Sequence, residues 1–281
     1  VLLGLLIFLP RLLRAPLQHY GKLILWILAF LVIIAGVIIS QTRATWLGVI
    51  AGMLTAFLLI FIEHGKRLSK KQLLLIFLLL TCLALLIITN SSLIIERATA
   101  EFDTIQALLR GDWNSVPLST SEIRSSVGER LYSWRAAIDM IAQRPLLGWG
   151  GQGVDYLFNN IQYNQAHYQD LNFGHLHNLY LEISLQYGLL GLAAYFYLLI
   201  WFTKNAWLAW KRGDMPGDVL LFFYAFLCFW SVINLFESYL IFWTGVFLFN
   251  VVMAGSLAHI WKPTLRTNSS APFVISEKDR K

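Results

Sequence analysis

The sequence predicts an all-α integral membrane protein, a polytopic helical bundle with one large helical segment outside the membrane. Of the 281 residues, 57% are hydrophobic and only 14% are charged, whereas soluble domains carry about 25% charged residues. Charge-free apolar runs recur along the chain, and each can cross about 30 Å of hydrocarbon as a helix. Helices are favoured for these runs because a chain in lipid must satisfy its backbone groups internally.

Six apolar runs are predicted to span the membrane as helices. They cover residues 23–42, 44–62, 72–95, 183–203, 219–236 and 238–261. The apolar run at residues 1–10 is too short to cross a bilayer, which takes about 20 residues. We interpret it as the end of a truncated helix, which indicates a C-terminal piece of a larger protein.

The positions of lysine and arginine predict the orientation of these helices. Most of the 22 basic residues lie in segments 11–22, 63–71, 204–218 and 262–281. These four segments fall on one side of the predicted bundle, which should be the cytoplasm. The net charge of +6 is therefore a sign of topology and not of nucleic-acid binding.

The chain is thus predicted to have four parts. Residues 1–89 and 177–261 form membrane helices, the first of them truncated, and residues 262–281 form a cytoplasmic tail. Residues 90–176 form an external segment, and connections of this length are more often functional than mere links. Within that segment, STSE at residues 119–122 has the form of a capping box at a helix start. Apolar residues then recur at helical spacing as far as Pro145.

The sequence predicts no metal site and no cofactor. Cys82 and Cys228 lie inside apolar runs, where free cysteine behaves as a small buried hydrophobe. His175 and His177 could ligate zinc, but on a helix they would not share a face, and no further ligand cluster supports them. The glycine-rich residues 148–153 lack the βαβ context of a nucleotide-binding loop and are interpreted as a tight turn.

Three residues on the external side are candidates for chemistry. Arg43 and Arg130 have guanidinium groups, which suit bidentate binding of phosphate oxygens. His177 has an imidazole, which titrates near pH ~6.5 in ordinary surroundings and can accept a hydroxyl proton. Arg43 could instead be a simple anchor at a helix end. Together these residues suggest group transfer from a lipid diphosphate, because no ATP is available outside the cell.

Further residues are predicted to support this site. Trp134 shares a helical face with Arg130 because the two are four residues apart. Glu182 lies one turn beyond His177 and is placed to orient or charge-balance it. Arg124 belongs, with Arg130, to a basic series on the external helix, and Asn178 directly follows His177.

The order and spacing of several short motifs resemble the O-antigen ligase superfamily of bacterial inner-membrane glycosyltransferases. The matching pieces are QTRATWLG at 41–48, GER at 128–130 with Trp134, RPLLGWG at 144–150, HNLYLE at 177–182 and QYGLLG at 186–191. Each piece is weak alone, but the combination spans roughly residues 41–191.

The resemblance implies a multi-pass GT-C-like fold in the bacterial inner membrane, with residues 90–176 as a periplasmic catalytic segment. It implies an undecaprenyl-diphosphate-linked glycan as donor and lipid A–core oligosaccharide as acceptor, without a required metal. By motif, Arg43 and Arg130 would bind the donor diphosphate. His177 would activate the acceptor hydroxyl, and attack would invert the anomeric carbon.

Other functions remain open from the sequence. O-antigen polymerases and protein O-oligosaccharyltransferases share the same superfamily pattern and differ in their acceptor. A transporter or flippase could use the same arginines and histidine along a substrate path, but the sequence shows no convincing internal repeat of the kind that transporters carry.

Overall fold

The computed structural model describes residues 1–13, 20–40, 42–64, 126–160 and 174–261, with a few isolated positions between 88 and 111. Every regular element in these ranges is a helix, which confirms the predicted all-α class. The helices are α1 (Leu2–Leu13), α2 (Tyr20–Ser40), α3 (Arg43–His64), α7 (Ser126–Gln143), α8 (Gly153–Asn160), α9 (Leu179–Lys211), α10 (Gly217–Ile233) and α11 (Trp243–Ile260). Most of the predicted span 72–95, the capping box at 119–122, Arg124 and the tail 262–281 lie outside the described residues.

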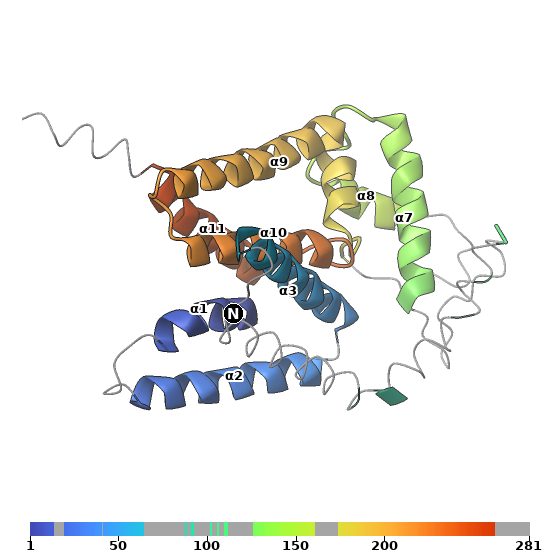
Figure 1. Cartoon of the computed structure of the whole chain (residues 1–281). Helices are drawn as coiled ribbons and strands as arrows, with labels where there is room; N and C mark the ends of the chain where they lie inside the picture. Colours follow the sequence, from blue (N-terminus) through green and yellow to red (C-terminus); the bar gives the residue numbers. More distant parts are fainter. Residues whose placement is uncertain are drawn as a thin grey trace, which may run out of the picture.

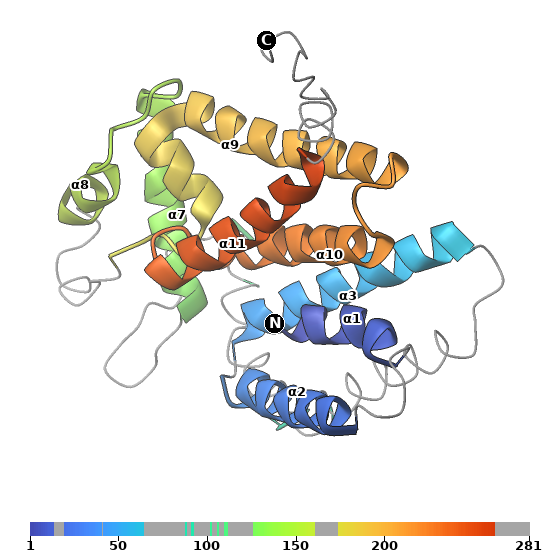
Figure 2. The ribbon, with the colours of Figure 1, turned by 90° about the vertical axis from the view of Figure 1, so that its left-hand side faces the viewer.

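The helices lie in layers around α10. α9 lies on one side, α10 and α11 form the middle, and α3, α1 and α2 follow on the other side (Figures 1 and 2). α7 and α8 pack against the first turns of α9, away from α1 and α2. The largest core cluster joins α9, α10 and α11 and is rich in aromatic side chains, among them Phe202, Phe223, Phe226, Trp230 and Phe249.

Two of the described helices, α9 and α11, are long and apolar enough to cross a membrane. α10 and the stretch Ala44–Ile60 within α3 are apolar but shorter. Large apolar side chains on α9 and α11 point away from the core, including Tyr197, Ile200, Phe247 and Val251. Such an exposed apolar surface suits a lipid environment, as expected for a helical membrane protein.

The ends of the predicted spans differ from those in the structure. α9 begins four residues earlier than predicted because Asn178 caps it, accepting the backbone N–H groups of Tyr180 and Leu181 at 3.1 Å. α11 begins at Trp243 instead of residue 238, because residues 234–242 form a turn. The eight-residue helix α8 was not predicted, and such a short helix shows too little apolar periodicity to be recognised.

Glycine allows α3 to approach α10 closely. Gly48 and Gly52 lie one turn apart on α3, in the small-residue spacing that brings membrane helices together. A β-carbon at Gly48 would come within 2.9 Å of the Phe229 ring, and one at Gly52 within 2.8 Å of the Ala225 carbonyl oxygen. This contact fixes the start of α3, and therefore the position of Arg43, relative to the end of α10.

α9 is interrupted at Gly188, where the backbone takes the non-helical angles φ 67° and ψ −172°. The helix changes direction at this break (Figure 2). Its backbone groups bond instead to the loop after α7, through Trp149 N–H to Leu185 O (2.8 Å), Gly150 N–H to Gln186 O (2.8 Å) and Leu189 N–H to Pro145 O (2.7 Å). The loop thus satisfies peptide groups that would otherwise be costly to bury.

We expect Gly188→Ala to destabilise the protein by about 3 kcal/mol or more. Only glycine adopts these backbone angles readily, and a β-carbon there would overlap the carbonyl group of Leu146. Thermal unfolding of the purified protein in detergent measures the effect. Gly151→Ala is the matched control, because a β-carbon at Gly151 meets nothing within 4 Å. An unfolding temperature for Gly188→Ala equal to that of the control would contradict this account of the break.

Candidate functional site

His177 lies in a strained loop directly before α9. Its φ of 51° is in the left-handed region, which few residues other than glycine adopt and which histidine visits more than most. Such strain persists only when surrounding contacts hold it, and it clusters at functional sites. Two contacts hold the neighbouring Leu176, which is fully buried. Its N–H donates to Glu182 Oε2 at 3.4 Å, and its carbonyl accepts the Trp134 indole N–H at 2.7 Å.

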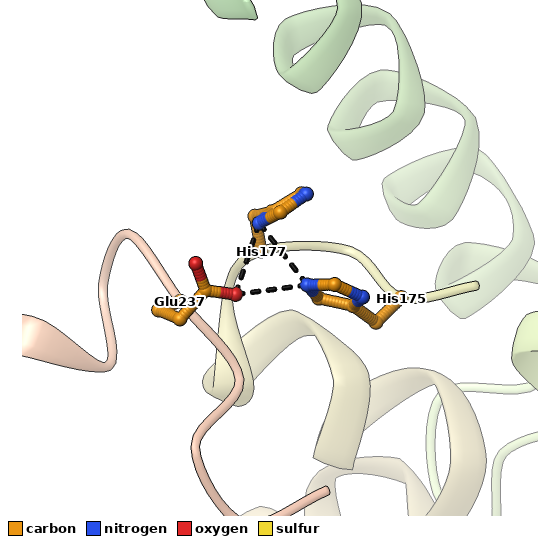
Figure 3. A group of neighbouring side chains, drawn as sticks. All are labelled: His175, His177 and Glu237. Atoms are coloured by element: carbon orange, nitrogen blue, oxygen red, sulfur yellow. Dashed lines mark hydrogen bonds and ion pairs between the residues drawn. The ribbon is translucent and has the colours of Figure 1, made fainter. Parts of the chain in front are cut away.

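A carboxylate from a distant part of the chain meets His177. Glu237 Oε1 lies 2.9 Å from His177 Nδ1 and 2.8 Å from His175 Nε2, and these two nitrogens are 3.1 Å apart. Figure 3 shows the three side chains converging, with the second ring nitrogen of His177 pointing away from Glu237. We call these three residues the histidine–glutamate cluster.

The turn between α10 and α11 positions Glu237. Its anchor is Asn234, which is fully buried. The Asn234 side chain accepts the Tyr239 N–H at 3.0 Å and donates to the Trp230 carbonyl at 2.8 Å, and its backbone carbonyl accepts the Leu179 N–H at 3.0 Å. Asn234 therefore clamps the turn to the first residue of α9 and sets Glu237 opposite His177.

Electrostatics favour the ionised carboxylate in the cluster. Burial by itself raises the pKa of Glu237, but hydrogen bonds from His175 and His177 and their positive charge outweigh it, so the pKa lies below its ordinary value. When His177 is neutral, an ionised Glu237, which only accepts hydrogen bonds, selects the tautomer that carries its proton on Nδ1. The proton-accepting nitrogen is then Nε2.

The start of α3 reaches the same turn. Burial and the negative charge of Glu237 raise the pKa of the Tyr239 phenol, and a hydrogen bond with the Thr45 side chain opposes this rise. Thr45 also accepts a 3.0 Å hydrogen bond from Thr42. Arg43, the first residue of α3, is therefore in the chain segment that contacts the turn carrying Glu237.

α7 brings Arg130 toward the loop that carries His177. Arg130 is half-buried and lies one turn before Trp134 on the same face of α7, and Trp134 donates its hydrogen bond to the residue preceding His177. Apolar side chains of α7, α8 and α9, including Ala137, Leu157 and Leu185, pack together with Leu176 of the loop.

The predicted site residues differ in how they are connected to the loop that carries His177. Contacts around one loop join His177, Asn178, Glu182 and Trp134. Arg43 and Arg130 lie on helices whose contacts with this loop or with the turn of Glu237 are made by other residues, Thr45 and Trp134. Arg124 lies outside the described residues. Glu182 was predicted to orient or charge-balance His177, but its carboxylate accepts the backbone N–H of Leu176. The carboxylate that bonds to the His177 ring is that of Glu237.

Sequence reasoning missed Glu237 as a site residue. Its signal was a lone acidic residue in the turn between two apolar runs, on the same predicted side as His177. The cluster also offers two imidazole nitrogens and one carboxylate oxygen within 4.8 Å of one another, a donor set that suits a transition metal. The sequence predicted no metal ligands because this third group was not recognised.

Comparison with known proteins identifies the family of the chain. The O-antigen ligase family model (Wzy_C) matches residues 28–196, which is more than half of the chain and includes Arg43, Arg130 and His177. The chain belongs to the O-antigen ligase family. The predicted resemblance is thereby confirmed, and Glu237 lies C-terminal to the matched range.

One curated relative is an uncharacterized protein of Haemophilus influenzae (strain ATCC 51907 / DSM 11121 / KW20 / Rd). It is 26% identical over 197 residues, which is 67% of this chain and 45% of the relative. The chain thus spans less than half the length of this relative. No solved structure matches this O-antigen ligase family chain.

We expect Glu237→Gln to lower the stability at pH 7 by about 1–3 kcal/mol, because it removes hydrogen bonds to an ionised acceptor. The folded-state pKa of Glu237 lies below its unfolded value, so this contribution is complete above pH ~4.3 and declines as the pH falls further. The unfolding temperatures of variant and wild type should therefore converge below that pH.

Thermal unfolding between pH 7 and pH 3 measures this convergence. Asp139→Asn, which changes an exposed carboxylate on α7, serves as the control and should unfold like the wild type at pH 7. A gap between Glu237→Gln and wild type that widens toward pH 3 would show that the carboxylate is not held ionised by the two imidazoles.

Proposed function

We propose that this protein transfers a glycan from an undecaprenyl-diphosphate carrier to a hydroxyl of lipid A–core oligosaccharide, without a metal. The observation that carries the proposal is the imidazole of His177, held in a strained loop by Glu237. Membership of the O-antigen ligase family supports a lipid-linked glycan as the substrate class. The donor, the acceptor and the residue roles are our proposal.

His177 acts as the general base. Its Nδ1–H donates to Glu237 Oε1, and Nε2 takes the proton of the acceptor hydroxyl. The acceptor oxygen then bonds to the anomeric carbon as the bond from that carbon to the diphosphate oxygen breaks. The bonding electrons leave on the diphosphate. Because the acceptor attacks the face opposite the diphosphate, the configuration at the anomeric carbon inverts. Glu237 stabilises the imidazolium that forms, in the manner of a carboxylate behind a catalytic histidine.

Arg43 and Arg130 bind the departing diphosphate. A guanidinium presents paired N–H donors to phosphate oxygens and keeps its charge at any working pH. Both positions are supported by contacts near the cluster, Arg43 through the Thr45–Tyr239 hydrogen bond and Arg130 through Trp134. Charge that develops on the leaving group is stabilised by these fixed cations.

The reaction takes place on the periplasmic face of the inner membrane. The cluster lies at the start of α9 and α11, whereas Lys204, Lys211 and Arg212 lie at the opposite end of α9. The positive-inside rule assigns this basic end to the cytoplasm. We retain residues 1–89 and 177–261 as membrane helices, 90–176 as the periplasmic segment and 262–281 as the cytoplasmic tail of a GT-C-like fold.

We expect His177→Ala to lower transfer by about 10²-fold or more while donor binding persists, because a general base contributes about 10²–10⁴-fold. The assay uses purified protein in liposomes, lipid-linked glycan and lipid A–core. His259→Ala is the control, since His259 contacts the Asp214 carbonyl at the far end of α11. Wild-type transfer by His177→Ala would remove this residue from the mechanism.

We expect Arg43→Lys and Arg130→Lys each to lower kcat/KM for the donor about tenfold or more, because a point charge cannot replace the planar guanidinium fork. The same liposome assay measures the change. Arg135→Lys on α7 is the matched control and should retain wild-type kcat/KM. Full activity in either test variant would argue against bidentate binding by that residue.

The glycolipids of cells that lack this protein identify the acceptor. If the protein is a ligase, as we expect, these cells should accumulate lipid-linked polymer and lack it on lipopolysaccharide. Cells without a polymerase should instead keep single repeat units on the core, and loss of a protein transferase should leave lipopolysaccharide unchanged. Either of the last two outcomes would preserve the chemistry proposed here and replace the acceptor.

A further inference from the structure

We propose that the histidine–glutamate cluster binds a divalent transition metal ion of the zinc class, and that the bound ion switches off glycan transfer. The ligands are His175 Nε2, His177 Nδ1 and Glu237 Oε1. The binding site stands on the geometry of these atoms alone. The inhibition rests on the proposed role of His177 as the general base.

The three ligand atoms lie close to the spacing of a metal site. Their separations are 2.8, 2.9 and 3.1 Å. Zinc binds imidazole nitrogen and carboxylate oxygen at about 2.0–2.2 Å, so neighbouring ligands in a tetrahedral site lie about 3.3–3.5 Å apart. Each pair therefore needs to separate by about 0.2–0.7 Å, and the fourth position is left for water.

The chemistry of the donors favours a transition metal over magnesium or calcium. Two imidazole nitrogens and one carboxylate oxygen form a common zinc set, whereas magnesium and calcium prefer oxygen ligands alone. The side chains of His175, His177 and Glu237 are 17%, 15% and 23% exposed, so an ion can enter from solvent. No backbone rearrangement is needed, since all three side chains already converge.

Neighbouring groups hold the ligands in place. The ring of Phe242 packs edge-on against His175, with ring centroids 5.4 Å apart and planes at 86°. The Ser238 N–H donates to Glu237 Oε1 at 3.3 Å. Such surrounding contacts orient metal ligands and increase affinity.

Metal binding would invert the tautomer that the proposed reaction needs. In the metal-free cluster the Nδ1–H of His177 faces Glu237, and Nε2 accepts the proton. A metal on Nδ1 uses the lone pair of that nitrogen, so the neutral ring must carry its proton on Nε2. A protonated Nε2 donates a hydrogen bond and does not accept a proton. The bound ion therefore removes the general base without touching the arginines.

Isothermal titration with ZnCl₂ tests the binding site directly. The protein is purified in detergent without a histidine tag and stripped of metal with a chelator, and no donor is present. We expect one saturable zinc site per chain, with affinity reduced at least about tenfold in His175→Asn and in Glu237→Gln. His259→Asn is the matched control and should bind like the wild type.

Absorption of bound Co²⁺ provides a test that does not depend on folded variants. Visible bands of a four-coordinate site with nitrogen and oxygen ligands, bleached by zinc, would support the cluster. Absence of saturable binding, or equal affinity in all variants, would overturn it. Thermal unfolding of each variant shows which variants are folded. The two test substitutions, His175→Asn and Glu237→Gln, lie in separate segments of the chain, so each one tests the site separately.

Transfer assays test the inhibition. Protein loaded with one equivalent of zinc is desalted before donor is added, so that free metal cannot bind the donor diphosphate. We expect at least a tenfold lower rate than for metal-free protein, and recovery after EDTA. Zinc should not lower the rate of His175→Asn further, whatever that rate is. Equal or faster transfer by the loaded protein would overturn the inhibition.

The two proposals fail in distinguishable ways. If metal-free wild-type protein does not transfer glycan, the proposed function fails, and titration still decides whether the metal site exists. If transfer is normal and titration detects no site, only the metal proposal fails.

Discussion

One carboxylate oxygen joins two distant parts of this protein. Glu237 Oε1 accepts hydrogen bonds from rings that are 60 and 62 residues away in the sequence. The close approach is possible because the buried Asn234 ties the turn of Glu237 to the first residue of α9. The orientation and the tautomer of the His177 ring depend on this junction.

The helices that the sequence predicts best are those marked by long charge-free runs. α2 and α3 lie close to the predicted spans because charged or polar residues interrupt the apolar pattern near their ends. α9 continues past Lys204 to Lys211, since a long lysine side chain reaches a polar surface while the helix goes on. α11 starts late because the Asn234 side chain accepts the Tyr239 N–H and keeps the preceding residues in a turn. The long-range bond from the Leu179 N–H that holds Asn234 in place is invisible in local composition.

The site residues, too, were predictable only where the signal lies in the local sequence. His177 was accessible to sequence reasoning because an imidazole at a helix start has few ordinary uses and its motif is distinctive. Glu237 was not, because its partner lies sixty residues away and a lone acidic residue in a turn between apolar runs suggests only a connection. The same holds for Trp134, whose helical face was predictable but whose hydrogen bond to Leu176 was not.

The interruption at Gly188 also has a mechanical consequence. The loop after α7 bonds to the backbone of α9 on both sides of the break, to Leu185 and Gln186 before it and to Leu189 and Leu190 after it. When bilayer thickness changes, a membrane helix accommodates by tilting. Because the loop braces both sides of the break, a tilt of the long arm is transmitted to α7, and the lipid can thereby act on the helix that carries Arg130.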